Sequence, residues 1–120
     1  MKSFTYIALL LLTTIVSGQT ALYNNGNIRI HDNGNLGFHT NLINESPFDD
    51  NSGLAGFYGS EITVSGTVVP LFFDVESGTS NGISMELGID NANNTLFITG
   101  NILTPRTQPE IYYNFLENGF

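Results

Sequence analysis

Short runs of alternating apolar and polar residues follow one another along most of this chain, each bounded by Gly, Asn, Asp or Pro. A period of two residues is typical of a β-strand with one buried face. The apolar positions that we expect to point inward are Ile28 and Ile30, Leu36 and Phe38, Ile62 and Val64, Leu71, Phe73 and Val75, Ile83, Met85, Leu87 and Ile89, and Leu96 and Ile98. The pattern predicts an all-β domain with almost no helix.

An internal repeat narrows the arrangement of the strands without deciding it. Residues 26–33 read GNIRIHDN and residues 34–41 read GNLGFHTN, so Gly, Asn, His and Asn recur in register. In one arrangement a hairpin turns at Asp32-Asn33-Gly34 and pairs Ile30 with Leu36, as in an antiparallel β-sandwich of hairpins. In the other, the same Gly turns the chain into the next face of a β-solenoid. Both arrangements keep the apolar side chains on one side.

The order of residues in the rest of the chain favours the solenoid. It runs through Asn44, Phe48, Asn51-Ser52-Gly53, Phe57, Gly59-Ser60, Ile62, Val64-Ser65-Gly66-Thr67, Phe73, Val75, Gly82-Ile83, Met85, Leu96, Ile98, Gly100-Asn101-Ile102 and Thr104. This order resembles a pattern common in exported, adhesin-like β-helical proteins of the Bacteroidetes, and the opening LYNNGNIRIHDNGNLGFHTNLIN is similar to the start of large flavobacterial cell-surface proteins. The resemblance implies a parallel β-helix and export by the type IX, gliding-associated route.

The chain departs from that pattern in two ways. Ser46-Pro47 and Val69-Pro70 interrupt it, and no C-terminal sorting domain is present before Phe120. We therefore interpret the chain as the N-terminal part of a longer protein whose remaining polypeptide follows Phe120. Proline cannot donate to a strand ladder, so the prolines at 105 and 109 predict a loop over residues 104–110. The segment Ile111 to Phe115 is then expected to form an exposed edge.

The first residues predict an exported protein. A basic start at Lys2, an apolar run from residue 6 to residue 16, and the small pair Ser17-Gly18 have the order of a secretory signal peptide. The run is shorter than the roughly 20 residues that a membrane-spanning helix needs. We predict a signal-peptide helix over residues 1–18, cleavage between Gly18 and Gln19, and a solenoid-like domain over residues 19–120. The predicted location is extracellular or on the outer-membrane surface, reached through the secretion machinery.

Composition excludes several classes of partner. The chain has 3 Lys and Arg residues against 11 Asp and Glu residues, for a formal net charge of −8. Nucleic-acid binding needs a dense basic patch, so we expect none. The chain contains no cysteine, so no disulfide can stabilise it. An acidic surface does suit divalent cations.

The strongest candidate metal site is the oxygen-rich cluster Glu45, Asp49, Asp50 and Asn51. Calcium takes six to eight ligands from such residue types. The cluster lacks the spacing of an EF-hand and of calcium-binding β-rolls, so we favour a solvated turn and predict no cofactor. His31 and His39 occupy the same place in the two octads, and without a third ligand at a supporting spacing we expect both on the surface.

Outward acids and aromatic residues are the remaining candidates. Asp74, Glu76, Glu86 and Asp90 lie on adjacent predicted strands, and paired carboxylates can cleave glycosides. Arg29 and Arg106 are the basic residues left after leader removal and are far in sequence from these acids, so we predict no enzyme. Aromatic residues able to stack on sugars or proteins are Tyr23, Tyr58, Phe72, Phe97, Tyr112 and Tyr113.

Taken together, the sequence predicts an exported, adhesin-like structural segment that acts as a rigid stalk or interaction surface. The alternative is a module that binds carbohydrate or calcium, and a polysaccharide-degrading enzyme is the weaker third hypothesis. The placement of the outward acids and aromatic residues distinguishes them. Convergence in one groove favours binding or catalysis, whereas scatter over several faces favours a spacer.

Overall fold

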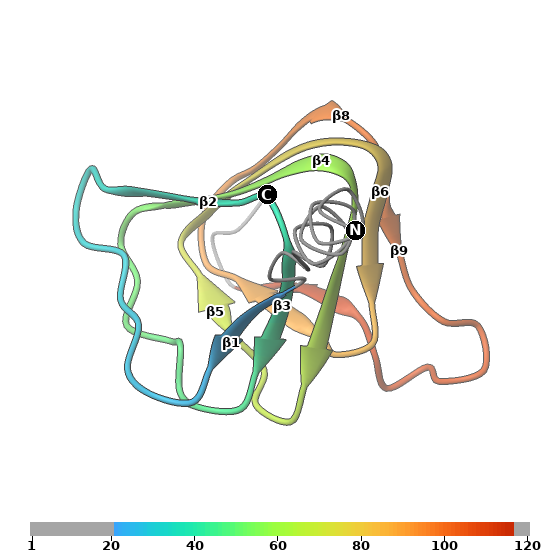
Figure 1. The fold of residues 1–120 in the computed structure, drawn as a ribbon, viewed down its shortest axis with the longest axis horizontal. Helices are drawn as coiled ribbons and strands as arrows, with labels where there is room; N and C mark the ends of the chain where they lie inside the picture. The colour runs from blue at the N-terminus through green and yellow to red at the C-terminus, as the bar shows by residue number, and fades with distance from the viewer. Residues whose placement is uncertain (1–20, 117–120) are drawn as a thin grey trace, which may run out of the picture.

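The chain forms a parallel β-solenoid of about five turns. The computed structural model describes residues 21–116, so the predicted signal peptide and its cleavage between Gly18 and Gln19 lie outside the described residues. Every strand pair in the described part is parallel. Residues 21–116 contain no helix, and thus none with the length and hydropathy needed to cross a membrane. In Figure 1 the turns lie one behind another.

The strands form two sheets. The seven-stranded sheet contains β1 (Ala21–Asn24), β2 (Asn35–Phe38), β3 (Asn41–Asn44), β4 (Leu54–Gly66), β6 (Asp74–Met85), β8 (Thr95–Thr99) and β9 (Ile102–Leu103). The three-stranded sheet contains β5 (Leu71–Phe72), β7 (Ile89–Asn91) and β10 (Tyr113–Phe115).

The long strands β4 and β6 turn a corner and so divide the larger sheet into two sides. The first halves of both strands pair next to β2 and β8, whereas the second halves pair next to β3 and β9. At the corner, Gly59 has φ of 112° and Gly82 has φ of 102°. Glycine adopts such angles without a steric cost. The register between the two strands shifts at the same place, between Gly59 and Glu61.

The parallel pairing decides between the two arrangements that the octad repeat left open. β2 pairs with β4, where Leu36 lies beside Ala55. The hairpin between Ile30 and Leu36 is therefore wrong, and residues 28–30 form no strand. Leu54 pairs with Asp74, and Val75 pairs with Thr95, so one turn takes about 20 residues.

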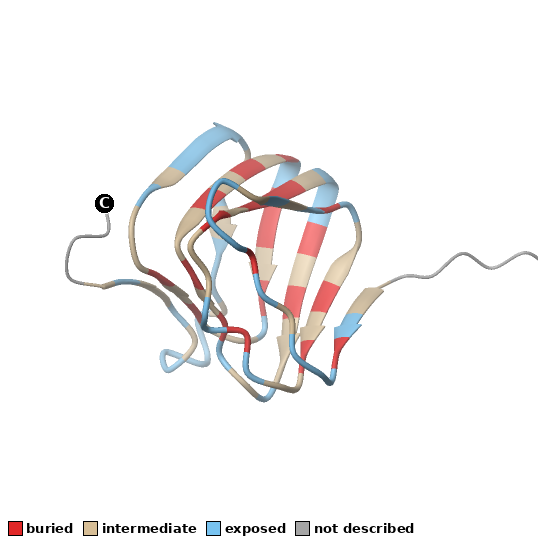
Figure 2. Ribbon diagram, turned by 90° about the vertical axis from the view of Figure 1, so that its left-hand side faces the viewer, coloured by how far each residue is buried: buried red, intermediate tan, exposed pale blue. Residues whose placement is uncertain are grey.

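Phenylalanine side chains fill the interior. Phe38 stacks on Phe57 with ring centroids 4.8 Å apart, and Phe48 meets Phe72 edge to face at 5.2 Å. All four rings are buried, and full burial of such a side chain contributes about 1.5–3 kcal/mol. Figure 2 shows the buried positions of neighbouring strands lined up across the stack. The predicted inward positions Ile62, Val64, Ile83, Met85 and Ile89 are buried, which confirms the alternation in the central turns.

The alternation fails where a strand is interrupted. Leu71, Phe73 and Val75 were the predicted inward set, and Phe72 was an outward candidate. Phe72 is fully buried, while Leu71 and Phe73 are only half-buried. β5 ends at Phe72 and β6 begins at Asp74, so the break at Phe73 reverses the side on which alternate residues point.

A similar error occurs in the last turn. Ser77, which points inward and is fully buried, pairs with Phe97. Phe97 therefore continues the inward column, and the prediction for Leu96 and Ile98 is wrong, with exposed fractions of 57% and 60%. The loop predicted over residues 104–110 is confirmed, because no strand is present there. β10 pairs on one side only and forms the edge expected near residues 111–115.

Candidate functional site

Three glycines form a flat area on the outer surface of the side made by β2, β4 and β6. Gly56 pairs with Gly37, and Tyr58, two residues further along β4, pairs with Gly78. Because these three positions lack side chains, the Tyr58 ring lies directly against the backbone. A Cβ added at Gly78 would stand 2.9 Å from its Cδ1, one at Gly37 would stand 3.4 Å from its Cε2, and one at Gly56 would collide with its Oη. The ring therefore covers the glycines, and Tyr58 as a whole is half-buried.

A hydrogen bond to Glu76 fixes this ring. Tyr58 Oη donates to Oε2 of Glu76 over 2.5 Å. The bond raises the pKa of the Tyr58 phenol above its usual value, and partial burial and the nearby carboxylate charge add to the rise. The ring is consequently held in a single orientation.

His39 extends the same area. Its ring centroid lies 5.4 Å from that of Tyr58, with the planes tilted by 31°. Its Nε2 is 3.3 Å from the Cβ position of Gly37. We call the Tyr58 and His39 rings over Gly37, Gly56 and Gly78 the aromatic platform.

A hollow of about 460 Å³ opens beside the platform. It is lined by Leu54, Asp74, Val75, Glu76, Asn94, Thr95 and Leu96, and we call it the outer groove. The Asp74 carboxylate in its wall accepts hydrogen bonds from Asn93 Nδ2 at 2.8 Å and from the Asn94 N–H at 3.2 Å. A second hollow of about 350 Å³ shares Leu54 and Asp74 with it. Two oriented carboxylates and an aromatic face thus gather on one side of the solenoid.

The remaining predicted acids lie elsewhere. Glu86 is exposed beyond the end of β6. Asp90 in β7, on the other sheet, accepts a hydrogen bond from Asn114 Nδ2 at 3.2 Å. The structure therefore brings Asp74 and Glu76 together but does not add Glu86 or Asp90 to them.

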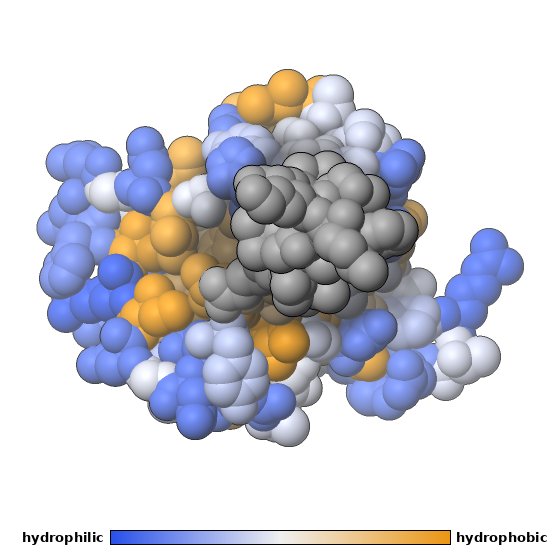
Figure 3. Space-filling model, in the orientation of Figure 1, coloured by the Kyte–Doolittle hydropathy of each residue, from blue (hydrophilic) through white to orange (hydrophobic). Residues whose placement is uncertain are grey.

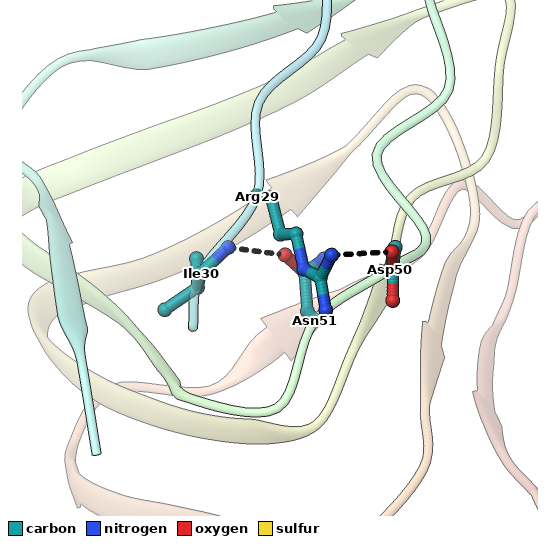
Figure 4. Close-up of polar contacts among 4 residues, drawn as sticks. All are labelled: Arg29, Ile30, Asp50 and Asn51. Carbon is teal, nitrogen blue, oxygen red and sulfur yellow. Dashed lines mark hydrogen bonds and ion pairs between the residues drawn. The ribbon is translucent and has the colours of Figure 1, made fainter. Parts of the chain in front are cut away.

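The predicted calcium ligands have separate partners. Arg29 Nη1 lies 3.0 Å from Asp50 Oδ2, and Asn51 Oδ1 accepts the backbone N–H of Ile30 at 2.8 Å, as Figure 4 shows. Glu45 accepts a hydrogen bond from Thr67 Oγ1, and Asp49 is exposed. Within residues 21–116 no three His, Asp or Glu side chains come close enough together to hold a metal ion.

The other candidates are spread over the surface or buried. His31 is exposed in a turn, where its carbonyl accepts the Gly34 N–H at 2.8 Å. Exposed aromatic side chains away from the platform are Tyr23, Phe97, Tyr112 and Phe115. Tyr113 is half-buried, and its Oη lies 2.6 Å from Thr95 Oγ1.

Buried asparagines are the residues that sequence reasoning missed. Asn24 Nδ2 donates to Asn44 Oδ1 at 2.7 Å, and Asn44 Nδ2 donates to the carbonyl of Val68 at 2.7 Å, so the amides link three successive turns. Asn51, which is half-buried and was already a candidate metal ligand, makes a similar link through Nδ2, which donates to the carbonyls of Phe48 and Leu71. The signal in the sequence is the spacing of 20 residues between Asn24 and Asn44, which equals one turn.

Strand β8 carries an exposed apolar strip made of Leu96, Phe97 and Ile98. In Figure 3 hydrophobic atoms gather at the top of the molecule, where Figure 1 labels β8. β8 pairs with β6 on one edge, and its other edge has no partner among the described strands. Leu96 belongs both to this strip and to the outer groove.

Comparisons with protein-family models, with curated proteins and with solved structures find no match to this chain. The relation to flavobacterial surface proteins therefore stays a prediction from the sequence.

Proposed function

We propose that the protein is an exported structural segment of the cell surface, in which the β-solenoid acts as a rigid stalk and carries an interaction surface on its side. The signal-peptide pattern and the resemblance to adhesin-like surface proteins support the location. Both come from the sequence alone, and the fold supplies the mechanical part of the proposal.

The observation that supports a stalk is the unbroken lateral pairing of the turns. β1, β3, β4 and β6 pair in succession, and β8 and β9 continue from β6. In such a stack the interfaces between neighbouring turns add up to the total stability. The amides of Asn24 and Asn44 tie the turns together at the ends of β1 and β3. Among residues 21–116, every buried side-chain nitrogen and oxygen atom has a hydrogen-bond partner. No unpaired polar side chain therefore destabilises the interior of this part.

The alternatives differ in their support. A carbohydrate-binding role gains from the aromatic platform and the outer groove, and is developed below. A calcium-binding role would need Glu45, Asp49, Asp50 and Asn51 to converge, and they are held by separate partners. A hydrolytic role would rest on Asp74 and Glu76, which already accept hydrogen bonds from asparagine and tyrosine neighbours.

Two measurements test the proposal. Mass spectrometry of the protein from the medium or cell surface of the source organism should find Gln19 at the N-terminus, and an intracellular chain that keeps residues 1–18 would overturn export. Amide ¹⁵N relaxation should give order parameters near 0.85 throughout β3, β4 and β6. A drop at every junction between turns would show a jointed chain and overturn the stalk.

A further inference from the structure

We propose that the aromatic platform and the outer groove form a binding site for a neutral glycan, with one sugar ring stacked on Tyr58 and its hydroxyl groups bonded to Glu76 and Asp74. The site names the ligand class of the interaction surface and so rests on that part of the proposed function, whereas the rigid stalk requires no such site and is tested separately.

The platform has the shape that a sugar ring needs. Because Gly37, Gly56 and Gly78 have no side chains, the Tyr58 ring lies close against the backbone at these positions. The face of an aromatic ring carries partial negative charge. The C–H groups on one face of a pyranose carry partial positive charge and present a matching flat surface.

The site is organised before any ligand arrives. The bond from Tyr58 Oη to Glu76 holds the ring, and the bonds from Asn93 and Asn94 hold the Asp74 carboxylate. Groups that are already fixed lose little conformational entropy on binding. Each carboxylate oxygen that is still free can accept a charge-assisted hydrogen bond from a sugar hydroxyl.

The charge of the groove selects the class of glycan. Asp74 and Glu76 are acidic, and no residue that lines the groove is basic. Of the two arginines in the described residues, Arg29 is paired with Asp50, and Arg106 lies exposed in the loop after β9. A uronic-acid or sulfated chain would be repelled, whereas a neutral chain offers only donors and apolar faces. The volume of the groove, about 460 Å³, lies within the range of pockets that bind small ligands. Leu54 and Leu96 give it apolar walls.

A purely structural role for Tyr58 is the competing explanation, since an aromatic ring over cross-strand glycines also shields the backbone from water. That role predicts a change of stability and no change of binding. The test therefore needs a binding readout.

Affinity electrophoresis of the full chain through native gels containing neutral polysaccharides provides it. The gels contain β-glucan, mannan or xylan, with polygalacturonate as the anionic comparison. We expect retardation by at least one neutral polymer and none by polygalacturonate. Tyr58→Ala should weaken the retardation about tenfold or abolish it, and Glu76→Gln should weaken it as well. Tyr112→Ala removes a tyrosine that is more exposed than Tyr58, at 55%, and lies outside the groove, and it should leave retardation unchanged.

Three results would contradict the proposed site. Absence of retardation in every neutral gel, retardation by polygalacturonate alone, or equal retardation of wild type and Tyr58→Ala would each overturn the site. Circular dichroism checks that Tyr58→Ala keeps its β-structure. If it does not fold, Glu76→Gln and Tyr58→Phe carry the test, because both nearly keep the side-chain volume. Tyr58→Phe removes the hydroxyl that donates to Glu76, and Glu76→Gln removes the carboxylate charge. None of these results changes the order parameters that test the stalk.

Discussion

The central turns and the last turn of this solenoid pair through the same parallel register but differ in what surrounds them. β4 pairs with β2 and β3 on one edge and with β6 on the other, whereas β8 pairs with β6 alone. Phe57 and Phe97 occupy the same inward column, since each pairs with Ser77. Phe57 is fully buried, and Phe97 is 47% exposed. The contribution of a solenoid residue to stability thus depends on whether a turn covers it from both sides.

The largest expected effect comes from replacing Phe57 and Phe97 by alanine. Phe57→Ala should cost about 3–5 kcal/mol of unfolding free energy, because it opens a cavity in the stacked rings. Phe97→Ala should cost less than about 1 kcal/mol, because water already reaches its ring. Urea unfolding of each variant measures the two values. Equal losses would show that the last turn is as tightly covered as the central ones.

The buried asparagines give the next largest effect. Asn44→Ala should cost about 2–3 kcal/mol, because it leaves the Asn24 amide and the Val68 carbonyl without their partner. Asn27→Ala is the matched control at an exposed position and should stay within about 0.5 kcal/mol of wild type. If thermal unfolding gives both variants the same stability, the amides do not tie the turns together.

The last turn should also respond to alkaline pH. Burial raises the pKa of Tyr113 from 10.0 to about 12, although its bond with Thr95 acts in the opposite direction. The unfolded chain loses this proton near pH 10 while the folded chain keeps it. The stabilisation is therefore complete below pH 10 and declines as pH rises to 12. Tyr113→Phe should remove this part of the decline, as measured by unfolding at pH 8 and pH 11. An unchanged decline in the variant would mean that Tyr113 is accessible to water.

The smallest expected effect concerns the exposed strip of β8. Ile98→Lys should change the free energy of unfolding by no more than about 0.5 kcal/mol, because the side chain is already in water. Ile62→Lys, at a buried position of β4, should prevent folding. Circular dichroism and urea unfolding compare the two. A large loss in Ile98→Lys would reveal that the strip is covered in solution.

Much of the fold followed from local patterns. The alternation at residues 62–64 and 83–89 located strands and most of their inward faces, and the prolines at 105 and 109 located a loop. The interruption at Phe73 did not follow, because it reverses the alternation without altering the pattern itself. The inward position of Phe97 did not follow either, because Leu96, Phe97 and Ile98 are all apolar and alternation alone does not choose between them. Of the residues in the proposed glycan site, Tyr58, Asp74 and Glu76 were among the candidates. The bond of Tyr58 to Glu76, beside the groove that Glu76 and Asp74 line, was not foreseen.

By itself, the sequence determined that the chain is all-β, that its turns bury aliphatic and phenyl side chains, and that an acidic surface faces the solvent. These properties depend on residues that are near one another in the chain. Only the tertiary structure decided that Tyr58 lies on Gly78 and bonds to Glu76, that Asn24 reaches Asn44, and that Phe97 rather than Leu96 continues the inward column. The reason is geometric: such partners are about 20 residues apart, and their alignment is fixed only when each turn closes on the one before it.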